Sequence, residues 1–125
     1  MINVTCVTID CADPDRASRF WAEALGWRQV GKHRAEPPEG GIFLEFIRVP
    51  ESKTVKNRVH LGLNSKELDS EIERLVGLGA TIAWEEEFPE DWPYRNVVLR
   101  DPEGNEFCLG NDDVEKVKDL LGITD

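Results

Sequence analysis

Four side chains of the kinds that bind metals or transfer protons lie in segments where apolar and polar residues alternate. In a strand, successive side chains point to opposite faces, so the apolar residues of each segment face the core and these four lie on the opposite face. Two thiols, an imidazole and a carboxylate suit tetrahedral zinc, while histidine and glutamate also serve in acid–base chemistry. Without a metal, the thiols would line an apolar pocket. The four are Cys6, Glu45, His60 and Cys108.

Six further residues are predicted to contact a ligand. Glu45 stands between Phe43 and Ile47, and a carboxylate on an apolar face needs a partner or a proton. The segment 85–95, "EEEFPEDWPYR", carries aromatic side chains that either close over a ligand or lie against the sheet. His33 lies in a polar turn and is expected to be exposed. The predicted ligand contacts are Thr8, Phe43, Ile47, Trp92, Tyr94 and Glu106.

Strands and helices that would position these residues follow from the periodicity. Asp13 and Pro14 predict the start of a helix that ends at Gly26, and an apolar stripe predicts another over about 65–78. In the segment 57–63, Val59, Leu61 and Leu63 are expected in the core. Strands are predicted over 3–11, 27–31, 42–49, 57–63, 81–86, 96–100 and 105–109, with a helical tail over 112–125.

The order of these elements repeats. The phrases "ALGW" at 24–27 and "GLGA" at 77–80 each end a helix, and each helix has one strand before it and further strands after it. This predicts an α+β protein of two βαβββ modules within one domain, 1–125. Module one spans about 1–50, a connector 51–57, module two about 58–111 and the tail 112–125.

The composition of the chain limits the classes of molecule that it is expected to bind. The chain of 125 residues has a net charge of −10, which disfavours nucleic acid, and it has no apolar run long enough to span a membrane. No leader-like segment opens the chain. Three cysteines, an odd number without a CxxC pair, suggest free thiols in a reducing compartment. We therefore expect a cytoplasmic protein whose partner is a small molecule.

The stretches "IDCADPDRASRFWAEALGW", "KNRVHLGL" and "LRDPEGNEFCLG" resemble the vicinal oxygen chelate superfamily of glyoxalases, extradiol dioxygenases and bleomycin-resistance proteins, in particular its small glyoxalase-like members. The resemblance covers roughly residues 3–110. It implies mixed, curved sheets that form an open cup with the helices outside, and a homodimer in which a second chain can complete the cup. The superfamily's metal positions fall on Cys6, Glu45, His60 and Cys108, so two of them carry thiols here.

Two functions follow from the resemblance. One is a small-molecule binding protein or enzyme in which a divalent metal, preferably zinc, or His60 polarises a carbonyl while Glu45 moves a proton, as in isomerases and lyases. The alternative is a non-catalytic binder that sequesters a cationic or drug-like compound, as bleomycin-resistance proteins do. The acidic charge and the aromatic residues of segment 85–95 would suit such a cation.

Overall fold

The computed structural model describes residues 1–124 and contains eight strands and three helices. The first module holds β1 (Cys6–Cys11), α1 (Pro14–Leu25), β2 (Arg28–Val30), β3 (Arg34–Glu36) and β4 (Phe43–Arg48). The second holds β5 (Gly62–Asn64), α2 (Leu68–Leu78), β6 (Thr81–Glu85), β7 (Asn96–Arg100) and β8 (Glu106–Gly110). Helix α3 (Val114–Leu120) follows.

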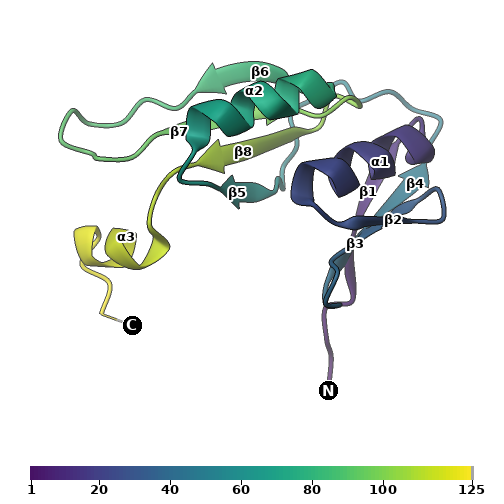
Figure 1. The fold of residues 1–125 in the computed structure, drawn as a ribbon, viewed down its shortest axis with the longest axis horizontal. Coiled ribbons are helices and arrows are strands. Elements are labelled where there is room, and N and C mark those ends of the chain that lie inside the picture. The colour runs from purple at the N-terminus through teal and green to yellow at the C-terminus, as the bar shows by residue number, and fades with distance from the viewer. Residues whose placement is uncertain (125) are drawn as a thin grey trace.

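The two modules form separate four-stranded sheets of the same design. Their strand orders are β1-β4-β3-β2 and β5-β8-β7-β6, and in each sheet the first and last strands of the module pair in parallel. The other pairs are antiparallel. Figure 1 shows α1 lying on the first sheet and α2 on the second. The predicted α+β fold with two βαβββ modules is therefore confirmed.

Helix α1 begins and ends where the sequence predicts. Asp13 is the N-cap, and its carboxylate accepts a hydrogen bond from the backbone N–H of Arg16 at 3.2 Å, with Pro14 next in the chain. At the other end Gly26 has a φ of 68°, a left-handed conformation that few other residues adopt without strain. These caps set the two ends of α1.

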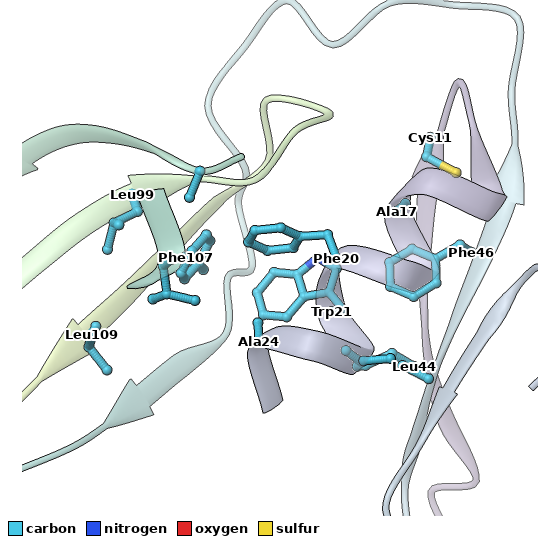
Figure 2. Packing of buried hydrophobic residues seen from close by; sticks show 14 of the residues in the cluster. Cys11, Ala17, Phe20, Trp21, Ala24, Leu44, Phe46, Leu99, Phe107 and Leu109 are labelled. Carbon is cyan, nitrogen blue, oxygen red and sulfur yellow. The ribbon is translucent and has the colours of Figure 1, made fainter. Parts of the chain in front are cut away.

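One face of α1 provides the centre of the hydrophobic core. Trp21 is 2% exposed and packs edge-on against Phe107 of β8, with ring centroids 4.9 Å apart, while Phe20 lies 6.2 Å from the same ring. Figure 2 shows Leu44 and Phe46 of the first sheet on the other side of the helix. Helix α1 is thus shared by both modules, and the core runs continuously from one sheet to the other.

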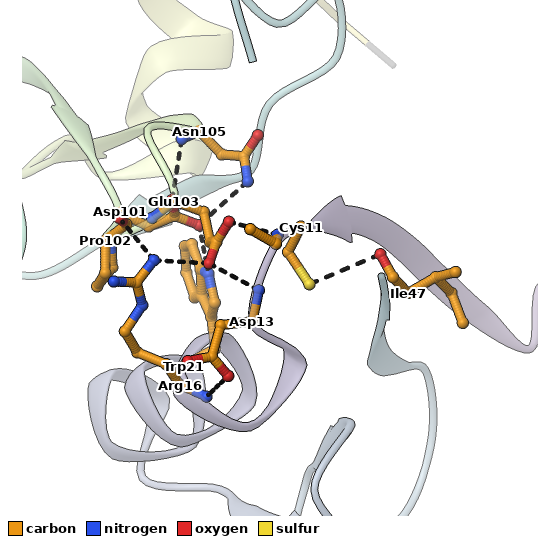
Figure 3. A network of polar contacts seen from close by, with 10 residues as sticks. Cys11, Asp13, Arg16, Trp21, Ile47, Asp101, Pro102, Glu103 and Asn105 are labelled. Atoms are coloured by element: carbon orange, nitrogen blue, oxygen red, sulfur yellow. Dashed lines mark hydrogen bonds and ion pairs between the residues drawn. The ribbon is translucent and has the colours of Figure 1, made fainter. Parts of the chain in front are cut away.

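Polar contacts join the second module to both ends of α1. At the N-terminal end, the Glu103 carboxylate accepts hydrogen bonds from the backbone N–H groups of Ala12 at 2.6 Å and Asp13 at 3.1 Å (Figure 3). At the C-terminal end, Arg74 of α2 donates to the carbonyl oxygens of Glu23 at 3.2 Å and Ala24 at 2.8 Å. A negative group therefore meets the positive end of the helix dipole, and a positive group meets its negative end.

The predicted strand over 57–63 is wrong for most of its length, since only Gly62–Asn64 is a strand. Val59, expected in the core, is 82% exposed, whereas Leu61 and Leu63 do pack against the core. The cause is a side chain: Glu106 accepts a hydrogen bond from the backbone N–H of Asn57 at 2.8 Å and draws this part of the chain away from the strand ladder.

Smaller differences concern the start of one helix, one added strand and the extent of the tail helix. Helix α2 begins at Leu68, after the predicted start, and Ser65 Oγ accepts the N–H of Glu67 at 3.1 Å just before it. The structure adds the short strand β3. The predicted tail forms α3, which buries none of its side chains. In residues 1–124 no helix has the length and hydropathy required to cross a membrane.

Candidate functional site

The side of the first sheet opposite α1, called here the helix-free face, carries several of the predicted site residues. Cys6 and Thr8 of β1 lie beside Glu45 of β4 because these strands pair in parallel with Thr8 opposite Glu45. Cys6 Sγ is 3.9 Å from Glu45 Oε2 and 3.8 Å from Thr8 Oγ1. On the α1 side, Leu44 and Phe46 of β4 are buried and Val7 and Ile9 of β1 pack partly buried against the core, in agreement with the face assignment made from the sequence.

Glu45 has a cationic partner that the sequence pattern did not reveal. Arg34 Nε lies 3.7 Å from Glu45 Oε1, and the guanidinium stacks 4.3 Å from the centre of the Phe43 ring. The partner comes from β3, which pairs with β4 so that Arg34 stands opposite Glu45. Recognising that short strand in the sequence would have identified the pair. Ile47, on the same face, is 43% exposed.

A cavity of about 300 Å³ lies between β1 and residues 57–61. It brings together three of the predicted site residues, Thr8, His60 and Glu106, which belong to different parts of the chain. Trp21 and Phe107 from the core contribute apolar surface to its walls. Both His60 and Thr8 are solvent-exposed, so a ligand could reach them directly. The cavity therefore combines apolar walls with accessible hydrogen-bonding groups.

Glu106, at the wall of this cavity, is 4% exposed and fully engaged by the protein. Its carboxylate accepts hydrogen bonds from Lys53 Nζ at 2.9 Å, Arg100 Nε at 3.1 Å and the backbone N–H of Asn57 at 2.8 Å. Burial by itself would raise the pKa of Glu106, but these three donors together lower it to about 2. Glu106 is thus ionised at neutral pH and electrically balanced by two cations.

The four potential metal ligands do not meet within residues 1–124. Cys6 and Glu45 are in contact, and His60 lines the cavity. Cys108 lies on the helix-free face of the second sheet, opposite Val98, with its sulfur close to the backbone of Gly62. No group of three or more histidine, cysteine, aspartate or glutamate side chains is arranged to hold a metal ion in this part of the chain.

The loop over residues 86–95 does not border the cavity. Trp92 instead contacts both Phe88 and Tyr94, whose ring centroids lie 5.8 Å and 6.2 Å from its own. The structure therefore separates these two predicted ligand contacts from His60 and places them in an aromatic cluster of their own.

A second cavity, of about 410 Å³, lies on the other side of the β7–β8 turn, next to Cys11 and Arg16. Arg16 is already paired with Glu103 at 2.7 Å. Cys11 is buried, and burial together with the nearby carboxylates of Glu103 and Asp13 raises the pKa of its thiol to about 11. Because Arg16, Glu103 and Lys53 are paired within the protein and the Cys11 thiol is protonated at neutral pH, this larger cavity is the weaker candidate.

Comparison with known proteins agrees with the architecture. Residues 6–110 match the sequence model of the glyoxalase-like domain. No curated protein matches the chain. Among solved structures, a glyoxalase/bleomycin resistance protein/dioxygenase family enzyme from Burkholderia phytofirmans PsJN superposes with a TM-score of 0.67 and 19% identity, covering 88% of this chain and 98% of its own.

Two further solved structures share the fold. The fosfomycin resistance protein FosX from Listeria monocytogenes, in complex with Mn(II) and 1S,2S-dihydroxypropylphosphonic acid, gives a TM-score of 0.73 at 16% identity over 97% of this chain and 99% of its own. A member of the glyoxalase/bleomycin resistance protein/dioxygenase superfamily from Sphaerobacter thermophilus gives a TM-score of 0.63 at 21% identity, covering 90% of this chain and 98% of its own. These likenesses show the fold, and the sequence match over 6–110 shows that the chain belongs to the glyoxalase-like domain family.

Proposed function

We propose that this protein binds a compact, polar, carbonyl-containing metabolite in the cavity between β1 and residues 57–61. The observation that carries the proposal is the meeting of His60 and Thr8, from the two modules, at one cavity with apolar walls. Its volume of about 300 Å³ is at the small end of the range for ligand pockets. An imidazole and a hydroxyl are suitable groups for orienting a carbonyl compound.

The same two residues suggest the chemistry. Thr8 Oγ1 would donate a hydrogen bond to the carbonyl oxygen, and His60 would accept a proton from the neighbouring carbon and return it elsewhere, as in an isomerase or lyase reaction. Glu106 is unsuited to this proton transfer, because a pKa of about 2 makes its carboxylate a weak base and three donors of the protein already occupy its oxygens. Its place at the wall is structural: by binding Lys53 and the backbone of Asn57 it fixes residues 53–57 against β8.

Glu45, the second residue predicted to move a proton, does not line this cavity. We propose a homodimer in which the helix-free face of the first sheet meets the helix-free face of the second sheet of another chain, which would complete a cup. Two features support this. Helix α1 packs between the first sheet and Phe107, so within residues 1–124 no helix covers the opposite face of that sheet, which carries Glu45. Both β1 and β5 are edge strands.

The donor set of this chain does not fit a hard divalent ion such as the Mn(II) bound by FosX. Two of its four positions are thiols, which prefer softer metals, and the Glu45 carboxylate is already next to the Arg34 guanidinium. The proposed chemistry therefore uses no metal. Zinc is the ion that two thiols, an imidazole and a carboxylate would select if a second chain brought them together.

Metal content tests this choice directly. Protein purified without a histidine tag is measured for zinc and manganese beside the Glu45→Ala and Cys108→Ala variants. We expect no stoichiometric metal in any of the three. Stoichiometric zinc in the wild type that disappears from both variants would contradict the metal-free mechanism and establish a zinc site.

The two histidines of the chain provide a matched test of the cavity. We expect a thermal-shift screen of α-ketoaldehydes and related carbonyl compounds to find ligands that stabilise the wild type. The control variant His33→Gln, changed in the turn between β2 and β3, should bind the same ligands. A ligand at 100 times its dissociation constant adds about 2.7 kcal/mol to the free energy of unfolding. For His60→Gln the affinity should fall about tenfold, the effect of roughly one hydrogen bond. Unchanged affinity would refute the site.

Measuring whether a bound compound is converted to product distinguishes an enzyme from the alternative function, a non-catalytic binder of cationic or drug-like compounds. Product formation followed by NMR that is lost in His60→Gln, while some binding persists, would identify a catalyst. Binding without conversion would favour the alternative, which the pairing of Glu45 with Arg34 supports because that carboxylate is not a free base. We also propose a cytoplasmic location, in keeping with the three free thiols.

A further inference from the structure

The loop between β6 and β7 carries a compact cluster of three aromatic rings. Phe88 and Trp92 are 5.8 Å apart at an interplanar angle of 31°, and Trp92 and Tyr94 are 6.2 Å apart at 80°. Phe88 is 44% exposed, and the other two rings are only half-buried. In Figure 1 this loop extends from the end of the second sheet, away from α1, and no other element covers it. Part of each ring is therefore open to solvent.

The charge around these rings is strongly negative. The one basic residue of the segment, Arg95, is paired with Glu85 at 2.8 Å and with Asp69 at 3.0 Å, so it does not neutralise the rest. Within residues 1–124, none of Glu87, Glu90 and Asp91 has an ion-pair partner. A cation approaching the rings would meet carboxylates and no competing positive charge.

The cluster is also held in place by the protein. The Arg95 side chain ties the end of the loop to β6 and α2, and its backbone N–H donates to Asn111 Oδ1 at 2.8 Å. Within the loop, the N–H of Trp92 donates to the carbonyl oxygen of Pro89 at 2.9 Å. Because these contacts fix the backbone on both sides of Trp92, little conformational entropy would be lost when a ligand binds.

We propose that Phe88, Trp92 and Tyr94 form a binding site for a small organic cation with an alkylated ammonium group. The faces of aromatic rings attract cations, and alkylated ammonium ions, being weakly hydrated, lose little by leaving water for such a surface. Two nearly perpendicular rings allow contact with two sides of the ammonium group, and the unpaired carboxylates add long-range attraction. This site is distinct from the cavity with His60 and does not depend on the function proposed there.

Choline and its uncharged isostere 3,3-dimethylbutan-1-ol provide the test, because they have nearly the same shape and differ in charge. Each is titrated into the full-length protein, and the indole N–H signal of Trp92 is followed by NMR. We expect choline to shift this signal saturably and the isostere to bind about tenfold more weakly, within the range of measured cation–π energies. Trp92→Phe and Trp92→Ala lack this signal, so their choline binding is measured by isothermal titration calorimetry beside the wild type. Trp92→Phe should retain most of the binding and Trp92→Ala should lose it.

Matched variants locate the site. Trp27→Phe replaces a tryptophan outside the loop and should leave choline binding unchanged, as should His60→Gln. The combined Glu87→Gln, Glu90→Gln and Asp91→Asn variant should weaken choline binding, and added salt should reduce it less in this variant than in the wild type. Near-UV circular dichroism confirms that each variant is folded.

Several results would overturn the proposal. These are equal affinity for choline and the isostere, unchanged choline binding in Trp92→Ala, and no saturable shift of the Trp92 signal at any soluble concentration of choline. A shift that depends on protein concentration and is absent in dilute solution would also overturn it, since the rings would then contact a second copy of the chain.

Discussion

Glu106 shows how a residue's surroundings decide its role. From the strand pattern it shares a face with Cys108, and the sequence suggests a ligand contact. In the structure it lies at the cavity wall, but three donors from the protein use its oxygens, and the connector residues Lys53 and Asn57 provide two of them. Its carboxylate therefore fixes the connector against β8.

This predicts a pH-dependent contribution of Glu106 to stability. The pKa of a glutamate is near 4.5 when unfolded and about 2 here in the folded state, so folding favours the ionised form. The stabilisation is fully present above about pH 4.5 and is lost as the pH falls toward 2. We expect Glu106→Gln to lower the free energy of unfolding by about 2 kcal/mol at pH 7, the order of hydrogen bonds to a charged group, and by clearly less at pH 3.

Urea unfolding at both pH values measures this difference. Glu73→Gln, on the exposed side of α2, is the matched control and should change stability little at either pH. A loss for Glu106→Gln that is as large at pH 3 as at pH 7 would show that the charge of Glu106 does not stabilise the fold.

At the scale of single residues, the sequence predicts contacts between neighbours in regular strands. It misses contacts made by very short strands and by segments without regular secondary structure. The contact of Cys6 with Glu45 follows from alternation in two long strands. The pair of Arg34 and Glu45 does not, because β3 has only three residues and borders a Pro/Gly-rich segment. Val59 was misplaced because alternation says nothing about the Glu106 carboxylate that holds the neighbouring backbone.

Helix α1 is the element on which both modules depend. Its boundaries were predictable, because Asp13, Pro14 and Gly26 are local signals. Its contacts with Glu103 and Arg74 were not, because these residues are respectively 90 and about 50 positions away in the chain. Local sequence therefore determines the helix, and long-range contacts determine what it joins.

We expect Glu103→Gln to destabilise the protein by about 1–2 kcal/mol. The replacement keeps an acceptor for one backbone N–H but removes the charge that faces the N-terminal end of α1 and Arg16. Thermal unfolding at pH 7 measures the loss. Glu39→Gln, in an exposed turn, serves as the control with no expected effect. If both variants are equally stable, the contact of Glu103 with α1 adds nothing to the fold.

For the whole molecule, the shared core predicts a single cooperative unfolding transition. Trp21 and Phe107 pack across the module boundary, so neither sheet can lose its packing alone. Tryptophan fluorescence and far-UV circular dichroism should give the same urea midpoint. In isolation, residues 58–125 should show no cooperative transition, because Phe107 would be exposed to water. Two separate transitions in the full chain would contradict a shared core.

The overall plan was largely predictable, and the arrangement of its halves was not. Repeated helix ends such as "ALGW" and "GLGA" indicate two βαβββ modules, and the polarity pattern indicates which face of each sheet a helix covers. How the modules sit together depends on the fit of Trp21 against Phe107, which no periodicity encodes. For this reason the sequence could not show that Trp92 and Tyr94, in the loop between β6 and β7, lie away from the cavity that His60 lines.

Because side-chain contacts at the two ends of α1 join the modules, the fold does not depend on an unbroken backbone between them. Residues 49–61 contain no helix or strand, whereas the junction between the modules is made by side chains on either side of this segment. A cut within 51–57 would break no regular element. One polypeptide that ends within 51–57 and a second that begins there should therefore reassociate into the native fold when mixed. The chain could then be used as a split protein whose two halves recombine without a covalent link.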